Sequence, residues 1–315
     1  MTIRTLHAER TGPVTLDLDL PAGTITVLAE AGRERASVTI RTADETGSSA
    51  DAVTGAVLRW EERGALVAKV EDTGSSITTV VHTGRGTTFV QSMGNVVANG
   101  SVIGLQLGSG GVVAGIGNMV VNGNGVFVNG QKISHGGAGT RIGGSPIEIT
   151  ALVPEGSTVL ALTRSADIDA EGTLTAVNGR TQSGDIRLGT VERTAVETQS
   201  GGVTIDRSQD ATIKTQSGGI RLGRTDLVQA TTMSGNIRIA DFGGTAQLKT
   251  MSGDITVHAT AGGDLSARTM SGDIDVTATA TALDENLDVQ TNSMSGRVRT
   301  PQHRAAASGA RRRRD

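Results

Sequence analysis

A short repeat between about residues 163 and 300 constrains the fold of this chain more than any other feature of its sequence. Most copies read Thr-x-Ser-Gly followed by an alternating segment, and their serines are Ser165, Ser183, Ser200, Ser217, Ser234, Ser252, Ser271 and Ser295. These serines lie 18, 17, 17, 17, 18, 19 and 24 residues apart. A period this short indicates stacked units that bury their apolar sides only against their neighbours.

Each unit contains two segments in which apolar and polar residues alternate, which is typical of β-strands with one buried face. The segment after Ser-Gly places its apolar residues at Ile186/Leu188, Val203/Ile205, Ile220/Leu222, Ile237/Ile239, Ile255/Val257 and Ile274/Val276. A second such segment precedes the next Thr, after a turn predicted at glycines such as Gly189 and Gly223. Seventeen residues cannot hold a strand, a helix and two connections. The sequence therefore predicts an all-β fold, a β-solenoid with coils of about 17 to 19 residues stacked about 4.8 Å apart.

The Ser-Gly pair is predicted to form a corner, because Gly adopts positive φ without a clash and a Ser hydroxyl can bond the local backbone. The residue before each Ser forms a row of Gln and then Met, namely Gln182, Gln199, Gln216, Met233, Met251, Met270 and Met294. We expect this row to stack on itself, inside the coil or at its corner, and a Met row indicates packing rather than a cofactor site. The outward positions carry mixed charge, which favours solubility.

The patterning divides the chain into four segments. Residues 1–80 are predicted to form an N-terminal β cap and first coils, in which residues 14–28 have a hairpin-like pattern and the single Trp60 packs within the cap. Residues 81–150 are Gly-rich, with Asn-Gly turns between short strands, and form either thin coils or a flexible insertion. Residues 151–300 are the regular repeats, and 301–315 a disordered basic tail.

Composition excludes several classes of protein. The formal net charge of −3 gives no overall attraction to nucleic acid or anionic membranes. The absence of cysteine excludes disulfides, thiol catalysis and Cys-ligated zinc. The start of the chain lacks the apolar run of a signal peptide, and no apolar stretch is long enough to span a membrane. We therefore expect a cytoplasmic location, with the cell surface reached by a non-classical route as the alternative.

Recurring acidic residues are the main candidates for chemistry. Asp185, Asp254 and Asp273 follow Ser-Gly, and paired carboxylates can carry out acid–base catalysis. Gly202, Gly219 and Asn236 interrupt their row, however, which favours turn capping. The five histidines have no metal-ligand spacing, and the Gly-rich stretch 108–115 lacks the Lys-Ser/Thr of a P-loop. We predict no catalytic, cofactor-binding or metal-binding residues and no cofactor.

The strand ending in Pro-x-Gly near residues 14–28 and the serial (T/S)-x-SG-(D/G/N)-(I/V) units of 163–300 resemble the bacterial "putative adhesin" family of β-strand-repeat domains. The resemblance implies a repeat architecture and a bacterial source. It brings no catalytic or binding residue to this chain.

Two classes of function remain. The favoured one is a non-enzymatic structural or interaction scaffold that presents an extended surface to a protein partner or to itself, as an adhesin does. The alternative is a carbohydrate-active β-helix enzyme, a polysaccharide lyase or hydrolase, which the near absence of aromatic residues disfavours. A weaker hypothesis is ice binding through a Thr column at the corners, consisting of Thr181, Thr198, Thr215, Thr232, Thr250 and Thr269. The tail residues Arg311 to Arg314 are interpreted as a solvated terminus, because no aromatic residue lies nearby to stack on bases.

Overall fold

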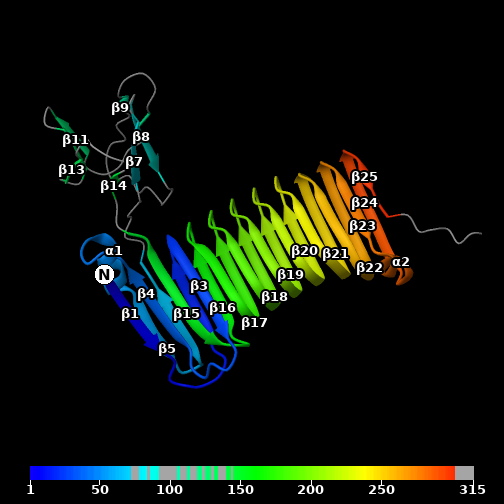
Figure 1. The fold of residues 1–315 in the computed structure, drawn as a ribbon, viewed down its shortest axis with the longest axis horizontal. Helices are drawn as coiled ribbons and strands as arrows, with labels where there is room; N and C mark the ends of the chain where they lie inside the picture. Colours follow the sequence, from blue (N-terminus) through cyan, green and yellow to red (C-terminus); the bar gives the residue numbers. More distant parts are fainter. Residues whose placement is uncertain are drawn as a thin grey trace, which may run out of the picture. The chain divides into compact units, whose positions relative to one another are not determined.

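A computed structural model describes residues 1–71 and 145–301 in full and, between these ranges, the backbone of short strands. The described chain is mostly β, with a long sheet of parallel strands (Figure 1). It divides into two compact units, residues 1–172 with 179–184 and residues 173–178 with 185–315. The basic tail predicted after Pro301 lies outside the described residues.

The N-terminal unit combines parallel and antiparallel strands with one helix. Its elements are β1 (Thr2–His7), β2 (Thr15–Leu20), β3 (Gly23–Glu30), β4 (Ser37–Thr42), α1 (Ser48–Gly55), β5 (Val57–Glu61), β6 (Ala65–Lys69), β15 (Ile147–Pro154), β16 (Thr158–Thr163) and most of β17 (Asp167–Thr181). β1 pairs with β4 and β5 with β6 in antiparallel fashion, and β4 also pairs with β15. The β-strands expected for the cap are present, and α1 adds a short helix between β4 and β5.

The hairpin expected over residues 14–28 is wrong, although both of its strands exist. β2 pairs in parallel with β6 and β16, and β3 pairs in parallel with β15 and β17. Leu16, Leu18 and Leu20 are fully buried, as the alternation predicts. Alternation identifies the buried face of a strand but not its neighbour, so a short turn between two strands does not by itself make them a hairpin.

Short strands in the Gly-rich segment pair in antiparallel fashion. They are β7 (Thr78–Thr83), β8 (Gly86–Gln91), β9 (Leu105–Gln106), β10 (Val112–Val113), β11 (Met119–Asn122), β12 (Gly125–Val128), β13 (Gln131–Ile133) and β14 (Thr140–Ile142). β11 to β13 form a meander, β9 pairs with β10, and β7 pairs with both β8 and β14. The expected short strands are thus found, while the rest of 81–144 lies outside the described residues.

The second unit repeats one parallel strand per sequence repeat. Its elements are β18 (Ile186–Thr198), β19 (Val203–Thr215), β20 (Ile220–Thr232), β21 (Ile237–Ser252), β22 (Ile255–Ser271), β23 (Ile274–Ala278), α2 (Ala280–Asp284), β24 (Leu287–Ser295) and β25 (Val298–Arg299). From β18 to β22 each strand pairs in parallel with the next, and Figure 1 shows these strands side by side. The turn predicted at Gly189 and Gly223 does not end the strand, which runs on for 13 residues in β18 and in β20.

The predicted aliphatic ladder is confirmed. Ile186, Val203, Ile220, Ile237, Ile255 and Ile274 are successive register partners. Each is at most 1% exposed. The ladder buries one face of every repeat against the next, as expected for units that are not stable alone.

A second buried row lies where the sequence predicted the turn. Its successive partners are Val191, Ser208, Thr225, Phe242 and Ala259. Each is at most 2% exposed. Ser208 donates to the Asp210 carbonyl, whereas Thr225 Oγ1 has no hydrogen-bond partner among the described residues. No repeating pattern in the sequence indicated this buried row, because its members range from Ser to Phe.

Candidate functional site

The corner of each repeat is built by Thr and Gly. The Thr232 hydroxyl accepts a hydrogen bond from the Gly235 N–H at 3.0 Å, and Thr181, Thr198 and Thr215 accept from the third following residue in the same way. Thr232, Thr250 and Thr269 also donate to a Gly carbonyl of the preceding repeat at 3.1 to 3.3 Å. The whole Thr column is 1 to 6% exposed. A buried column cannot bind ice, so that hypothesis is wrong.

Two details of the predicted corner are also wrong. The Ser side chains from Ser200 to Ser271 are exposed, and the Thr two positions earlier makes the local hydrogen bond instead. Gly218, Gly235 and Gly253 do not have positive φ, although Gly272 of the Ser271-Gly272 corner does, at 157°. A Cβ on Gly235 would lie 1.9 Å from the Gly218 carbonyl oxygen, and one on Gly218 1.8 Å from that of Gly201. Glycine is therefore required because the backbone of the preceding repeat occupies the space of a side chain.

The acidic residues after Ser-Gly cap the backbone of the next repeat. Asp185 Oδ1 accepts from the Gly202 N–H at 2.9 Å. Asp254 Oδ1 accepts from the Asp273 N–H, and Asp273 Oδ1 from the Arg297 N–H, each at 2.8 Å. Asn236 does the same for the Asp254 N–H. The turn-capping interpretation of these residues is confirmed, and one carboxylate oxygen of each is engaged by the backbone of the next repeat.

The Gln and Met row, which the sequence placed either inside the coil or at its corner, lies at the surface. Met233, Met251 and Met270 are 46 to 50% exposed, and Met294 is 77% exposed. Since Thr250 pairs with Thr269 and Ser252 with Ser271, Met251 and Met270 occupy equivalent positions on adjacent strands. The row is thus an exposed apolar strip and does not belong to the core.

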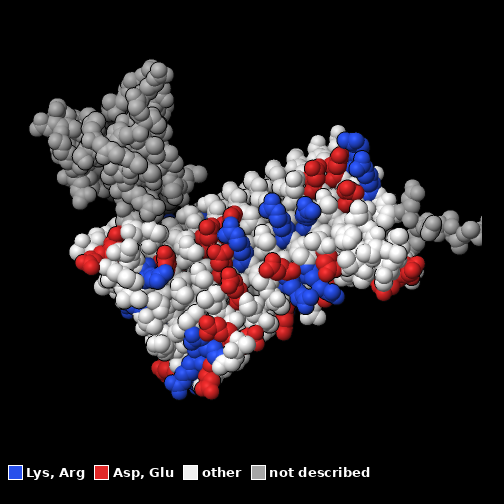
Figure 2. All heavy atoms as spheres, viewed as in Figure 1, with Lys and Arg blue, Asp and Glu red and all other residues white. Residues whose placement is uncertain are grey.

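The outward rows carry interspersed charges. Figure 2 shows acidic and basic side chains alternating over the described face, and local ion pairs such as Arg187–Asp185 and Arg224–Asp241 join some of them. Exposed pairs of this kind contribute little to stability.

Among the described residues, no three His, Cys, Asp or Glu side chains lie close enough together to hold a metal ion. The helices in the described ranges are too short or too polar to cross a membrane. Of the five histidines, His82, His135 and His303 have side chains outside the described residues.

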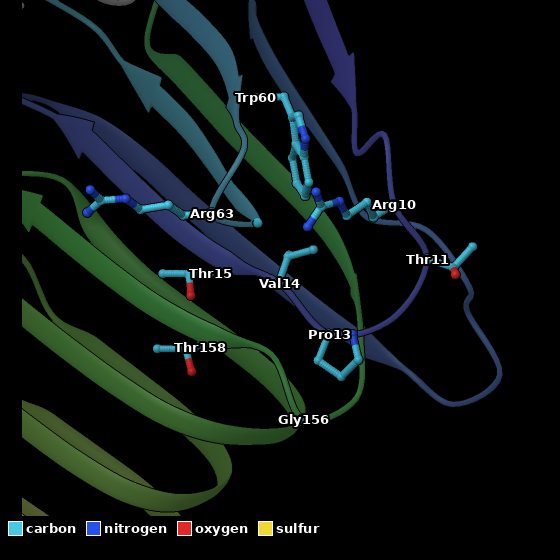
Figure 3. Close-up of a pocket in the computed structure, with 10 residues that line it drawn as sticks. Arg10, Thr11, Pro13, Val14, Thr15, Trp60, Arg63, Gly156 and Thr158 are labelled. Carbon is cyan, nitrogen blue, oxygen red and sulfur yellow. The ribbon is translucent and has the colours of Figure 1, made fainter.

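A hollow of about 320 Å³ lies at the amino ends of three strands of the N-terminal unit (Figure 3). Thr15 begins β2, and its register partners are Ala65 in β6 and Thr158 in β16. The Thr15 N–H donates to the Gly64 carbonyl, and the Thr158 N–H to the Val14 carbonyl. The lining is thereby fixed by backbone hydrogen bonds between segments far apart in the sequence.

Three large side chains border this hollow. Trp60 lies on β5, Arg63 in the turn between β5 and β6, and Arg10 in the segment between β1 and β2. Figure 3 shows the Arg10 guanidinium beside the Trp60 indole and Arg63 on the other side of Val14. Trp60 is half-buried, so it packs within the unit as predicted and also faces the hollow.

Asp19 is the described group whose titration the fold clearly alters. Burial raises the pKa of the Asp19 carboxyl above its ordinary value of 3.8, and the Asp17 charge adds to this effect. The nearby Lys69 and Arg164 oppose the increase in pKa. Asp19 lies on β2 at the end opposite Thr15 and takes no part in the hollow.

Parallel strands in register, Gly and Thr corners and side chains that cap the next repeat define a class of β-repeat proteins stabilised by neighbour-to-neighbour contacts. A family model described as "Toastrack DUF4097" matches residues 118–313. The chain belongs to this DUF4097 toastrack family, which confirms the resemblance found in the repeat motif.

The chain is also similar to solved structures of bacterial proteins. A "putative adhesin" from Parabacteroides merdae is 9% identical, with a TM-score of 0.40, 96% of this chain and 97% of that chain covered. A "putative lipid binding protein" from Parabacteroides distasonis is 12% identical, with a TM-score of 0.41 and the same coverage. A "putative adhesin" from Bacteroides fragilis is 12% identical, with a TM-score of 0.35, covering 95% of this chain and 97% of that one. No curated protein matches the chain.

Proposed function

We propose that the repeats form a β-solenoid that serves as a non-enzymatic, adhesin-like interaction scaffold. One observation carries the proposal: the Thr and Asp side chains that recur in the repeat are engaged in building the stack. The corner Thr hydroxyls bond Gly N–H and carbonyl groups, and Asp185, Asp254 and Asp273 each accept from the backbone of the next repeat. What the repeats leave available is their outward surface.

That surface offers two kinds of contact. The outward strand positions present mixed charges, such as Glu197, Lys214, Lys249 and Arg268 on one row. The exposed Met row adds an apolar strip along the corners. Met is a flexible side chain that adapts to differently shaped partners. We place the contact with a protein partner, or with a second copy of the chain, on this side of the repeats.

Protein capture and sedimentation experiments with matched variants test whether the repeats act as an interaction scaffold. The purified chain is used to capture proteins from extracts of its own cells, and its own association is measured by sedimentation. Met251→Glu/Met270→Glu adds two charges to the Met row, while Thr204→Glu/Thr256→Glu adds the same charge to outward positions of another row. We expect the first variant to lose a contact that the second keeps. Equal binding by the wild type and both variants would place the contact elsewhere, and no binding at all, with the chain monomeric, would contradict the proposal.

The enzyme alternative is tested separately. Pure protein is incubated with a panel of acidic and neutral polysaccharides, and cleavage is followed by reducing ends and by ultraviolet absorbance of unsaturated products. We expect no cleavage, because Asp254 and Asp273, the neighbouring carboxylates of the row after Ser-Gly, cap backbone groups. Cleavage that Asp254→Asn or Asp273→Asn abolishes would replace the scaffold by the enzyme.

A further inference from the structure

The hollow in the N-terminal unit has a charge pattern that the repeats lack. Its lining contains Arg10 and Arg63 and no acidic residue. Among the residues that the structure describes, neither arginine side chain has a hydrogen bond or an ion pair with the protein. By contrast, Arg33, Arg41 and Arg59 of the same unit each face a carboxylate at 2.6 to 2.8 Å.

The unpaired Arg10 guanidinium, which Figure 3 shows beside Trp60, favours an anion, and Arg63 adds positive charge on the other side of Val14. A guanidinium binds carboxylate or sulfate oxygens through two parallel hydrogen bonds, a geometry that a lysine ammonium does not provide. Glu61, the acidic residue next to Trp60, is engaged by Arg59 at 2.8 Å and does not line the hollow. The positive charge of Arg10 and Arg63 is therefore available to a ligand.

The remaining lining residues indicate what the anion is attached to. Trp60 supplies a half-buried aromatic surface on which the apolar face of a ring can stack. Thr11, Thr15 and Thr158 add hydroxyl groups, and Figure 3 shows those of Thr15 and Thr158 pointing the same way from adjacent strands. Apart from Trp60, the apolar residues of the lining are the small Pro13 and Val14. A ring with several hydroxyl groups matches this lining better than a hydrocarbon does.

We infer that this hollow binds an acidic sugar, with its carboxylate or sulfate group on Arg10 and its ring on Trp60. A volume of about 320 Å³ lies at the lower end of small-molecule pockets, about 300 to 1,000 Å³, and suits one sugar ring with its acidic group. The site is independent of the repeat scaffold. It gives the N-terminal unit a ligand of its own, such as the acidic residue of a polysaccharide.

Trp60 is the only tryptophan of the chain, so its emission and its indole N–H signal report on this hollow alone. The wild type is titrated with glucuronic acid, with glucose as the neutral ring and with sodium sulfate as the bare anion, at constant ionic strength. We expect a saturable change in Trp60 emission or in the indole N–H chemical shift with glucuronic acid, with a dissociation constant on the order of 1 mM for so open a site. Glucose and sulfate should bind at least tenfold more weakly.

Matched variants separate the site from general charge effects. Arg10→Gln should weaken glucuronic acid binding at least tenfold and Arg63→Gln by a smaller factor, while Arg41→Gln, which removes an equal charge from the Glu148 pair on β4, should leave it unchanged. Thermal melting checks that all three variants fold. Equal affinity for glucose, an equal response to sulfate alone, equal losses in Arg41→Gln, or no saturable change up to 100 mM glucuronic acid would each overturn the inference. None of these outcomes bears on the scaffold, which is tested through the Met row.

Discussion

The regular repeats and the N-terminal unit satisfy their backbone groups in different ways. In β18 to β22 each strand is followed in parallel by the equivalent strand of the next repeat, so that equivalent positions of successive repeats are register partners. The N-terminal unit pairs β1 with β4 and β5 with β6 in antiparallel fashion and places α1 beside β1 and β4. In the repeats a side chain packs against the side chain at the equivalent position of the next repeat. In the N-terminal unit it packs against a neighbour from a strand of unrelated sequence.

This difference has a consequence for function. Polar groups that recur along the repeats, such as the Thr corners, are engaged in stacking. Groups that occur once, such as Trp60 and the unpaired Arg10 and Arg63, gather at the hollow of the N-terminal unit. The irregular unit can form an individual site, while the repeats provide a surface.

The largest expected effect tests the inward ladder. Ile220→Asp places a carboxylate on a position that is fully buried between Val203 and Ile237, and we expect it to lower the free energy of unfolding by about 3 to 5 kcal/mol. Thr204→Asp, half-buried and flanked by Arg187 and Arg221, should change that free energy by less than about 0.5 kcal/mol. Urea denaturation measures both, and equal midpoints would contradict the assigned faces.

The next effect compares glycines of the two regions. Gly235→Ala in a repeat corner brings a Cβ to 1.9 Å from the Gly218 carbonyl oxygen, so adjacent repeats must separate locally. We expect a loss of about 3 kcal/mol, the upper range for overpacking. Gly55→Ala at the end of α1 has no atom within 4 Å and should alter stability by less than about 0.5 kcal/mol. If thermal melting shows similar losses for both, close backbone approach is not what selects glycine at the corners.

A smaller effect compares two buried threonines. Thr225→Val removes a hydroxyl that has no partner among the described residues, and we expect it to raise the free energy of unfolding by about 1 kcal/mol. Thr163→Val in β16 removes a hydroxyl that donates to the Ala166 carbonyl at 3.0 Å and should lower it by about 1 kcal/mol. Chemical denaturation gives the sign of the change in the free energy of unfolding for each variant. A stabilising Thr163→Val together with a destabilising Thr225→Val would contradict the assignment of a bonded hydroxyl to Thr163 and an unpaired one to Thr225.

The smallest effect concerns Asp19 of β2. Because burial raises its pKa in the folded state, the folded protein binds the proton more tightly than the unfolded chain does. The stability that Asp19 contributes is present below the ordinary pKa of 3.8 and is lost as the pH rises through the raised pKa. Asp19→Asn should therefore stabilise the protein at pH 7 and not at pH 3, by no more than about 0.5 kcal/mol since the side chain is partly solvated. Urea midpoints at the two pH values test the sign; a variant less stable than the wild type at pH 7 would contradict it.

The sequence alone determined the features that depend on one strand at a time. Successive side chains of a strand point to opposite faces, so alternation was enough to assign the Ile186 to Ile274 ladder as buried and Arg187 or Arg221 as exposed. The fixed spacing of the serines was enough to indicate stacked units and the family. Asp185, Asp254 and Asp273 were also interpreted correctly, because the interruption of their row argued against a paired site.

Only the tertiary structure decided what depends on two segments together. The hydroxyl that closes each corner belongs to Thr, and Gly is required by the carbonyl of the repeat before it, a contact that does not exist within a single repeat. The Met row is exposed because the corner turns it away from the ladder, and the strands of residues 14–28 pair with β6, β15, β16 and β17 instead of with each other. The hollow joins Arg10, Trp60 and Thr158, because β2 pairs in parallel with β6 and β16 and β6 pairs in antiparallel fashion with β5, which carries Trp60. The partners on β2 and β16 are 143 residues apart in the chain, a distance over which no local pattern carries information.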